Sequence, residues 1–237
     1  MATQRGNILF LILLAVVLFA ALSYAVTSST RGGGKDASPE KYKTMAAQLV
    51  QFGTLVEQSI IRARTVGGAP EWGLDLDDGS GPSTSNNNNT CTDPGCLIFT
   101  KPGRTGLMTS VKFGEEYVDP AFRANNPSYG GGSGTEMSFR MIPVAGMGTA
   151  LPDLLYTIQG LTPALCQAVN ESLWGRAYSE EEGYGGGIQA YSGTLTGPLT
   201  STAPNLWDGF YTGKNTACIG RLGSGYGGDF YYVVMPR

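Results

Sequence analysis

The feature that most constrains this chain is an uncharged apolar run near its N-terminus, from Ile8 to Val26 (ILFLILLAVVLFAALSYAV). At a rise of 1.5 Å per residue, about 20 such residues span the roughly 30 Å hydrocarbon core of a bilayer. A segment of this composition is stable only in lipid or among other apolar helices. The sequence therefore predicts a helix over residues 7–26 that spans a membrane or lies in the core of an assembly.

Three interpretations of this segment are open. A secretory signal peptide would be cut after Ala25, although the apolar core of such a peptide usually holds only 7–15 residues. A signal anchor would stay uncut in the membrane. In the third interpretation, residues 1–6 form a short leader that is cut between Gly6 and Asn7, and the apolar helix is retained.

The four cysteines indicate an oxidising compartment for the rest of the chain. An even number of cysteines behind an export segment predicts two disulfides, and the most economical of the three connectivities pairs Cys91 with Cys96 and Cys166 with Cys218. A four-thiolate zinc site is the rival interpretation, but the paired C-x-x-C spacing is missing. Basic residues flank the apolar run on both sides and do not decide its orientation, so the cysteines place the long C-terminal part outside the cytoplasm.

Composition argues against catalysis and against a nucleic-acid partner. The chain has no histidine, which removes Ser-His-Asp and Cys-His catalysis and His-ligated zinc. Its net charge of -3 provides no basic field for nucleic acid. The acidic run Glu180–Glu182 and Asp229 are the only acidic candidates for catalysis, and a solvated charge run explains the former better. We expect a protein that is not an enzyme and that uses no cofactor.

A second helix is predicted after a Gly-rich joint over residues 27–37. Three consecutive glycines, Gly32 to Gly34, disfavour a helix there by roughly 1 kcal/mol each. Ser38 is a suitable N-cap and Pro39 suits the first helical position, so the helix is expected to run from Ser38 to about Thr65. Apolar or small residues recur along it at three- and four-residue steps: Tyr42, Met45, Ala46, Leu49, Phe52, Gly53, Val56, Ile60 and Ala63. This stripe is expected to pack on the helix's own domain, with packing on neighbouring copies as the alternative.

The remainder, to residue 237, is predicted to be a loop-rich region with short strands. The expected strands are Cys96–Thr100, Leu107–Phe113, Glu136–Pro143, Gly187–Tyr191 and Phe230–Met235. A short helix over Thr162–Trp174 has a Thr cap, a Pro in its first turn and Cys166. The predicted fold class is α+β: a disulfide-bonded domain over residues 38–237, in which the long amphipathic helix packs on a small antiparallel β-sheet, preceded by the N-terminal hydrophobic helix.

Two motifs in the loops carry weaker predictions. Asp75, Asp77 and Asp78 are clustered as in a calcium loop, but the twelve-residue pattern is incomplete and a solvated acidic turn is the favoured interpretation. The sequences Asn88-Asn89-Thr90 and Asn170-Glu171-Ser172 match N-glycosylation acceptors, which matter only in a host that glycosylates.

Taken together, this layout resembles the type IV pilin or pilin-like family, and most closely its type IVb-like members. The resemblance is carried by Arg5-Gly6 before Asn7, the apolar run, the second amphipathic helix and the late pair Cys166 and Cys218. The stretch LTPALCQAVNESLWG is similar to the type IVb element in which a short, Thr-Pro-capped helix carries the first cysteine of a C-terminal disulfide loop. Together these segments cover about the first 65 and the last 75 residues.

The resemblance implies a structural subunit of a type IV pilus-like filament or secretion apparatus. It implies cleavage between Gly6 and Asn7 by a prepilin peptidase, an inner-membrane anchor with a periplasmic domain, and later a place at the cell surface with other copies of the chain or other pilin-like subunits as partners. The residues of the assembly helix would include Ile8, Leu11, Ala15, Leu18 and Leu22.

Two departures from the family pattern argue against a major subunit and are compatible with a minor pilin, a pseudopilin or a pilin-like monomer. Leu11 stands at the fifth mature position, where most pilins have a Glu that is thought to neutralise the neighbouring subunit's N-terminus. The Gly32–Gly34 break interrupts what is usually one long helix. The alternative function is a membrane-anchored surface or periplasmic binding protein, adhesin-like, that does not polymerise. Its binding face would be built from loop aromatics: Tyr178, Tyr184, Tyr191, Trp207 and Tyr226.

Overall fold

The computed structural model describes residues 14–19, 39–77, 91, 94–125, 137–142, 144, 146–149, 151–177, 189–190, 211–220 and 227–237. They belong to two compact units, Met1–Pro39 and Glu40–Arg237. The second unit contains the long helix α2 (Pro39–Thr65) except for its first residue, both disulfides and every strand among the described residues. Its fold class is α+β, as the sequence predicts.

Helix α2 presents one apolar stripe to the rest of its unit. Eight of the nine residues of the predicted stripe are buried, and Tyr42 packs against the same core half-buried. Glu40 in the first turn and Arg62 and Arg64 in the last turn complement the helix dipole. The predicted packing of this stripe on the helix's own domain is therefore confirmed, while the predicted cap Ser38 lies outside the described residues.

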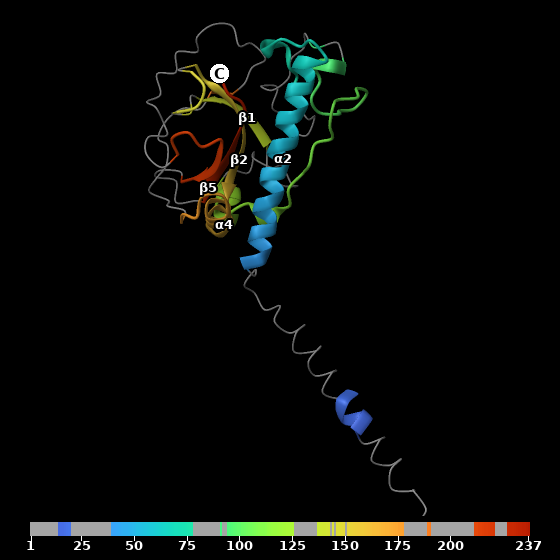
Figure 1. Cartoon of the computed structure of the whole chain (residues 1–237), viewed down its shortest axis with the longest axis vertical. Coiled ribbons are helices and arrows are strands. Elements are labelled where there is room, and N and C mark those ends of the chain that lie inside the picture. Colours follow the sequence, from blue (N-terminus) through green and yellow to red (C-terminus); the bar gives the residue numbers. More distant parts are fainter. Residues whose placement is uncertain are drawn as a thin grey trace, which may run out of the picture. The chain divides into compact units, whose positions relative to one another are not determined.

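The sheet on which α2 packs is antiparallel throughout, with the strand order β3-β1-β2-β5-β4. Figure 1 labels α2 and the strands β1, β2 and β5. Its strands are β1 (Met137–Ile142), β2 (Asp153–Leu161), β3 (Gln189–Ala190), β4 (Thr216–Ile219) and β5 (Gly228–Met235). The short edge strand β3 contributes two residues. The two central strands, β2 and β5, are buried along their whole lengths.

The two faces of the sheet belong to two separate apolar clusters. Side chains at alternate positions of β5, such as Phe230, Tyr232 and Val234, join the cluster that contains α2. Their neighbours Tyr231 and Val233 join a smaller cluster on the opposite face, which also includes Leu155 of β2 and Ala217 of β4. The period-two alternation of a strand sends successive side chains of β5 to opposite faces, and both faces are apolar because each packs on one of the two clusters.

The predicted strands are confirmed only in part. The predicted strands Glu136–Pro143 and Gly187–Tyr191 contain β1 and β3, and Phe230–Met235 covers β5 except for its first two residues. By contrast, Cys96–Thr100 and Leu107–Phe113 were wrongly predicted as strands and form only isolated bridges, Asp75↔Leu97 and Phe99↔Met108. Strands β2 and β4 were missed. Because β2 is buried on both faces it shows no alternation, and Gly160 near its end has a φ of +68° beside a shift in register.

The predicted short helix is present as α4 (Pro163–Trp174). The hydroxyl oxygen of Thr162 accepts a hydrogen bond from the Leu165 N–H at 3.3 Å, Pro163 occupies the first turn, and Gly175 ends the helix in the left-handed conformation. The remaining short elements are 3₁₀ turns and one further helix: η1 (Glu71–Gly73), η3 (Pro94–Cys96), η4 (Glu115–Tyr117) and α3 (Pro120–Asn125).

The chain's last residue is tied to the start of β2. The buried Asp153 carboxylate accepts hydrogen bonds from the N–H groups of Val144 (2.9 Å) and Arg237 (2.8 Å). Burial raises the pKa of Asp153, and these two bonds oppose the rise. The Arg237 guanidinium contacts Glu71, which also pairs with Arg64 in the last turn of α2. This network joins the C-terminal end of α2 to the sheet.

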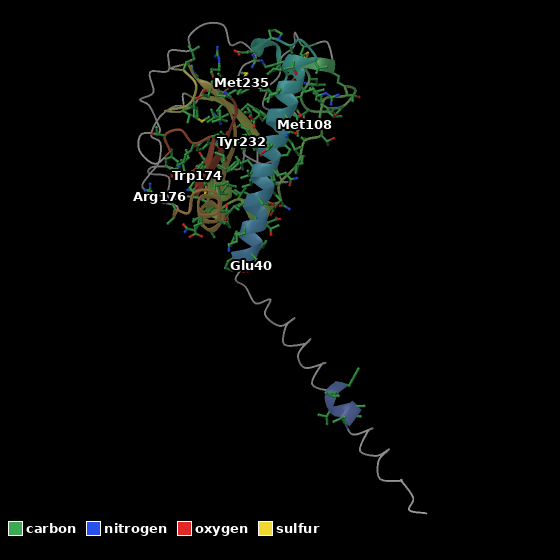
Figure 2. The ribbon with its side chains drawn as sticks, viewed as in Figure 1. Glu40, Met108, Trp174, Arg176, Tyr232 and Met235 are labelled. Atoms are coloured by element: carbon green, nitrogen blue, oxygen red, sulfur yellow. A yellow bond between two sulfur atoms is a disulfide. The ribbon has the colours of Figure 1, made fainter. Side chains whose placement is uncertain are left out.

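Helix α2 lies directly against the sheet at Gly53. A Cβ atom at this position would lie 2.5 Å from ring atoms of Tyr232, which is labelled on β5 in Figure 2. The Tyr232 hydroxyl donates a hydrogen bond to the carboxylate of Glu57, also in α2, at 2.8 Å. Glycine is therefore required at position 53 because the aromatic ring occupies the space of a side chain.

We predict that Gly53→Ala destabilises the protein despite the better helix propensity of alanine. Overpacking of this kind costs about 1–3 kcal/mol, which exceeds the roughly 1 kcal/mol that alanine gains over glycine in a helix. Chemical denaturation of the full chain in detergent measures the change. Lys43→Ala on the exposed side of α2 is the control, with an expected change below about 0.5 kcal/mol.

The same substitution in a Tyr232→Ala background tests the cause. The penalty of Gly53→Ala is expected to shrink there, because the ring that the new methyl group meets is gone. An equal penalty in both backgrounds contradicts the steric explanation.

Candidate functional site

The described part of the predicted assembly helix is apolar on every side. Residues 14–19 are helical, and their large side chains are exposed: Leu14 (47%), Val16 (62%), Val17 (56%), Leu18 (57%) and Phe19 (75%). Of the predicted assembly residues, Ala15 and Leu18 lie in this turn and a half. Gly6, Asn7, Ile8, Leu11 and Leu22 lie outside the described residues.

A helix that is apolar all round has no face suited to water. Six consecutive apolar residues that remain exposed within their own chain need lipid or other apolar helices to cover them. Within the described residues, where only 14–19 represent the apolar run, no helix combines the length and the apolar character needed to cross a membrane.

Both predicted disulfides form. Cys91 and Cys96 close a small ring with their Cα atoms 5.8 Å apart, and Cys166 of α4 is joined to Cys218 of β4 with a Cα separation of 5.1 Å. All four cysteines are buried. The second bond closes a loop of about fifty residues, so it removes much more entropy from the unfolded chain than the first.

Asn170 supports the second disulfide from inside the protein. Its side-chain amide is fully buried, donates to the carbonyl of Cys218 at 2.7 Å and accepts from the N–H of the same residue at 2.9 Å. The asparagine of this glycosylation acceptor sequence therefore has a structural role, because its side chain is hydrogen-bonded to the backbone of β4. The other acceptor sequence, residues 88–90, lies outside the described residues.

The acidic cluster at Asp75 is buried and paired with cations. Asp75 is fully buried, and its carboxylate contacts the ammonium group of Lys101 at 2.8 Å and the guanidinium of Arg104 at 3.5 Å. Lys101 also pairs with Asp77 at 3.3 Å, and Arg104 donates to the Cys91 carbonyl beside the small disulfide ring. The interpretation as a solvated acidic turn was wrong for Asp75 and Asp77, since residues distant in the sequence supply cations that pair with these carboxylates.

The same contacts differ from those of a calcium site. The carboxylates of Asp75 and Asp77 face ammonium and guanidinium groups, whereas calcium binds through several oxygens directed at one point. Asp78 lies outside the described residues. Among the residues that the structure describes, no group of three or more acidic, Cys or His side chains is arranged to hold a metal ion.

We predict that Lys101→Met destabilises the fold by about 3 kcal/mol, because the Asp75 carboxylate then stays buried with only the more distant Arg104 as its cation. The control is Arg123→Ala, which breaks the exposed pair of Arg123 with Glu115 and is expected to change stability by less than about 1 kcal/mol. Thermal and chemical denaturation measure both. Equal, small effects at the two sites contradict a structural role for the buried pair.

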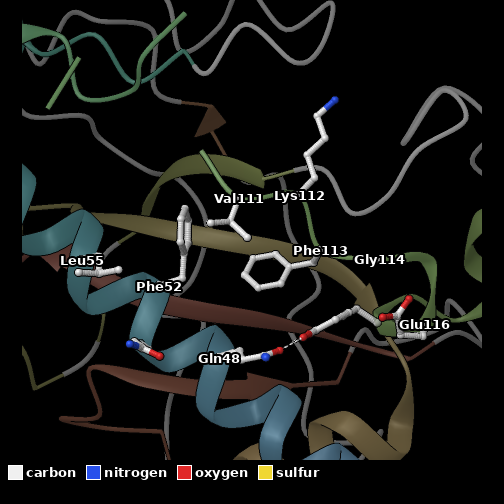
Figure 3. Close-up of a pocket in the computed structure, with 10 residues that line it drawn as sticks. Gln48, Phe52, Leu55, Val111, Lys112, Phe113, Gly114 and Glu116 are labelled. Atoms are coloured by element: carbon white, nitrogen blue, oxygen red, sulfur yellow. Dashed lines mark hydrogen bonds between the residues drawn. The ribbon is translucent and has the colours of Figure 1, made fainter. Parts of the chain in front are cut away.

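Beside α2 lies a groove that the sequence analysis did not predict. One pocket of about 450 Å³ is lined by α2 and by the segment 111–117 (Figure 3). Its apolar floor contains Phe52 and Phe113, whose ring centroids lie 5.7 Å apart in an edge-to-face arrangement. At one end the Tyr117 hydroxyl donates to the Gln48 amide oxygen, and burial raises the pKa of that tyrosine.

A second pocket of about 360 Å³ continues along α2 and shares Phe52, Leu55 and Val111 with the first. Leu55 and Val111 are 46% and 44% exposed on opposite walls. We name the two pockets together the α2 groove. A signal for it was present in the sequence, because Leu55 is an apolar residue that lies off the buried stripe of α2.

One further candidate residue, Asp229, lies in the described part of the chain. The carboxylate of Asp229, an acidic candidate for catalysis, is buried and accepts a hydrogen bond from the Gly160 N–H at 2.9 Å. This bond gives Asp229 a structural role between β5 and β2. Glu180–Glu182 and the five loop aromatics proposed for a binding face lie outside the described residues.

The structure thus defines a class of protein by its architecture. It is an α+β domain in which a long helix covers one face of an antiparallel sheet and two disulfides cross-link the chain. A separate stretch of exposed apolar helix lies near the N-terminus. Comparison of the chain with protein-family models, with curated proteins and with solved structures finds no match.

Proposed function

We propose that this protein is a structural subunit of a type IV pilus-like filament or secretion apparatus, held in the inner membrane before assembly. The observation that carries the proposal is the exposed apolar helix at residues 14–19, within an uncharged run of nineteen residues, in the same chain as a disulfide-bonded helix-on-sheet domain. An apolar helix leaves the bilayer without a large penalty only when neighbouring helices replace the lipid.

The order of the elements supports the same proposal. A leader-like segment ending at Gly6, an uncharged apolar run, an amphipathic helix on an antiparallel sheet and a late disulfide between Cys166 and Cys218 follow one another along the chain. Leu11 and the Gly32–Gly34 break favour a minor subunit. Other copies of the chain or other pilin-like subunits are then the partners of the apolar helix.

A second candidate is an anchored surface or periplasmic binding protein that does not polymerise. The α2 groove favours it, because this groove is open and apolar and does not involve the N-terminal segment. In this alternative the apolar run serves only as an anchor, and the chain never enters a filament.

We predict that the envelope form of the protein begins at Asn7. Edman degradation or mass spectrometry of the N-terminal peptide from purified envelopes measures this, and Gly6→Leu is expected to leave the leader attached because it enlarges the small residue at the junction. A mature N-terminus at Val26 would defeat the proposal, since the apolar helix would then be lost.

We predict that Val17→Arg removes the chain from filaments. An arginine near the middle of an apolar helix costs about 3 kcal/mol in a membrane, and it leaves an unpaired charge in a helical core. The quantity to measure is the chain recovered with sheared surface filaments, by antibody labelling and negative-stain microscopy, with an expected fall of at least tenfold. Val66→Arg is the matched control, because Val66 is 80% exposed at the end of α2. Normal incorporation of Val17→Arg contradicts the role of this helix in assembly.

A further inference from the structure

We infer that the α2 groove binds an extended polypeptide segment of six or seven residues, with apolar side chains at its centre and an acidic residue at one end. This function goes beyond filament assembly and does not rest on it, because no residue of the groove belongs to the N-terminal apolar run.

The first argument is the unpaired backbone along one wall. Residues 107 and 108 bond to 97 and 98 and Tyr117 bonds back to Gly114, but the backbone groups of 109–112 take part in no hydrogen bond in the described part of the chain. In Figure 1 this part of the chain runs alongside α2 without joining the sheet. Free N–H and C=O groups in a row are what an added strand pairs with.

The second argument is the opposite wall. Gln51 and Gln58 of α2 are exposed, and their amides have no hydrogen-bond partner among the described residues. A primary amide donates and accepts at once, as a peptide group does. The groove therefore offers hydrogen bonds that suit a peptide backbone on both sides of an apolar floor.

The third argument is charge. Arg62 lies at one end of the groove and Glu116 at the other, both exposed and without an ion-pair partner in the part of the chain that the structure describes. Lys112 points away from the pocket (Figure 3). A segment with an acidic residue at the Arg62 end and a basic or neutral residue at the Glu116 end is complementary to this arrangement.

The dimensions give the length of the segment. From Gln48 to Arg62, α2 advances by about 21 Å at 1.5 Å per residue. An extended chain covers this distance with about six residues at roughly 3.3 Å each. Leu55 and Val111, on the two walls, face the centre of such a segment, where apolar side chains would cover them.

The test uses the full chain in detergent and a phage-displayed library of random heptapeptides. We expect at least tenfold enrichment over the groove-blocked variant Leu55→Arg, with Asp or Glu recurring at one end of the selected peptides. Selection on Arg62→Glu is expected to replace that acidic residue by Lys or Arg. Lys41→Glu, a charge reversal on the same helix outside the groove, is expected to leave the selected sequences unchanged.

Hydrogen exchange supplies the second readout. A selected peptide, synthesised and added in excess, is expected to slow amide exchange in segment 109–112 at least tenfold and to leave the exposed first turn of α2 unchanged. Enrichment that is equal on wild type and Leu55→Arg, or selected peptides that do not slow exchange in 109–112, overturns the inference. Protection of 109–112 that appears without peptide, and only where the chain self-associates, assigns the groove to a second copy and also overturns it.

Discussion

The contact on which the rest of the domain depends is the packing of α2 against β5 and β2. Its centre is the pair formed by Gly53 and the ring of Tyr232, where the helix comes close enough that no side chain fits between them. Phe52, one residue earlier, inserts among Phe99, Phe113 and Tyr156, so the same turn of the helix reaches both the sheet and the loop segment beside it. A close helix-sheet contact of this kind fixes the position of α2 and therefore the walls of the groove along it.

Around this core, polar groups that sequence reasoning would place in water are buried and fully engaged. Asp75 is enclosed by Lys101 and Arg104, while Asn170 bonds both backbone groups of Cys218. The first contact connects two loop segments and the second connects α4 to β4, and each lies beside a disulfide. In a chain with 35 glycines, whose unfolded state is rich in conformational entropy, such cross-links stabilise the folded loops.

The two surfaces with functional potential are physically different. The helix at residues 14–19 is apolar on all sides and suits a medium without water, whereas the α2 groove combines an apolar floor with free backbone groups, amides and opposite charges at its ends. The first suits lipid or a bundle of like helices. The second suits a peptide in water. A chain can carry both because the flank of α2 beside its buried stripe is exposed at Gln51, Leu55 and Gln58 and stays available.

The sequence by itself determined those parts of the protein that depend on local pattern. The stripe of α2 follows from a 3.6-residue period, and α4 follows from a Thr-Pro cap. Strand β1 follows from an apolar run bounded by turn residues. The disulfide pairs follow from choosing the most economical of the three possible connectivities. Only the tertiary structure decided the rest. Strand β2 is buried on both faces, so its sequence shows no alternation. Asp75 is buried with cations, Lys101 and Arg104, that lie 26 and 29 residues further along the chain. The groove exists because residues 107–117 lie beside α2. These features depend on contacts between distant residues, which a local period or spacing does not encode.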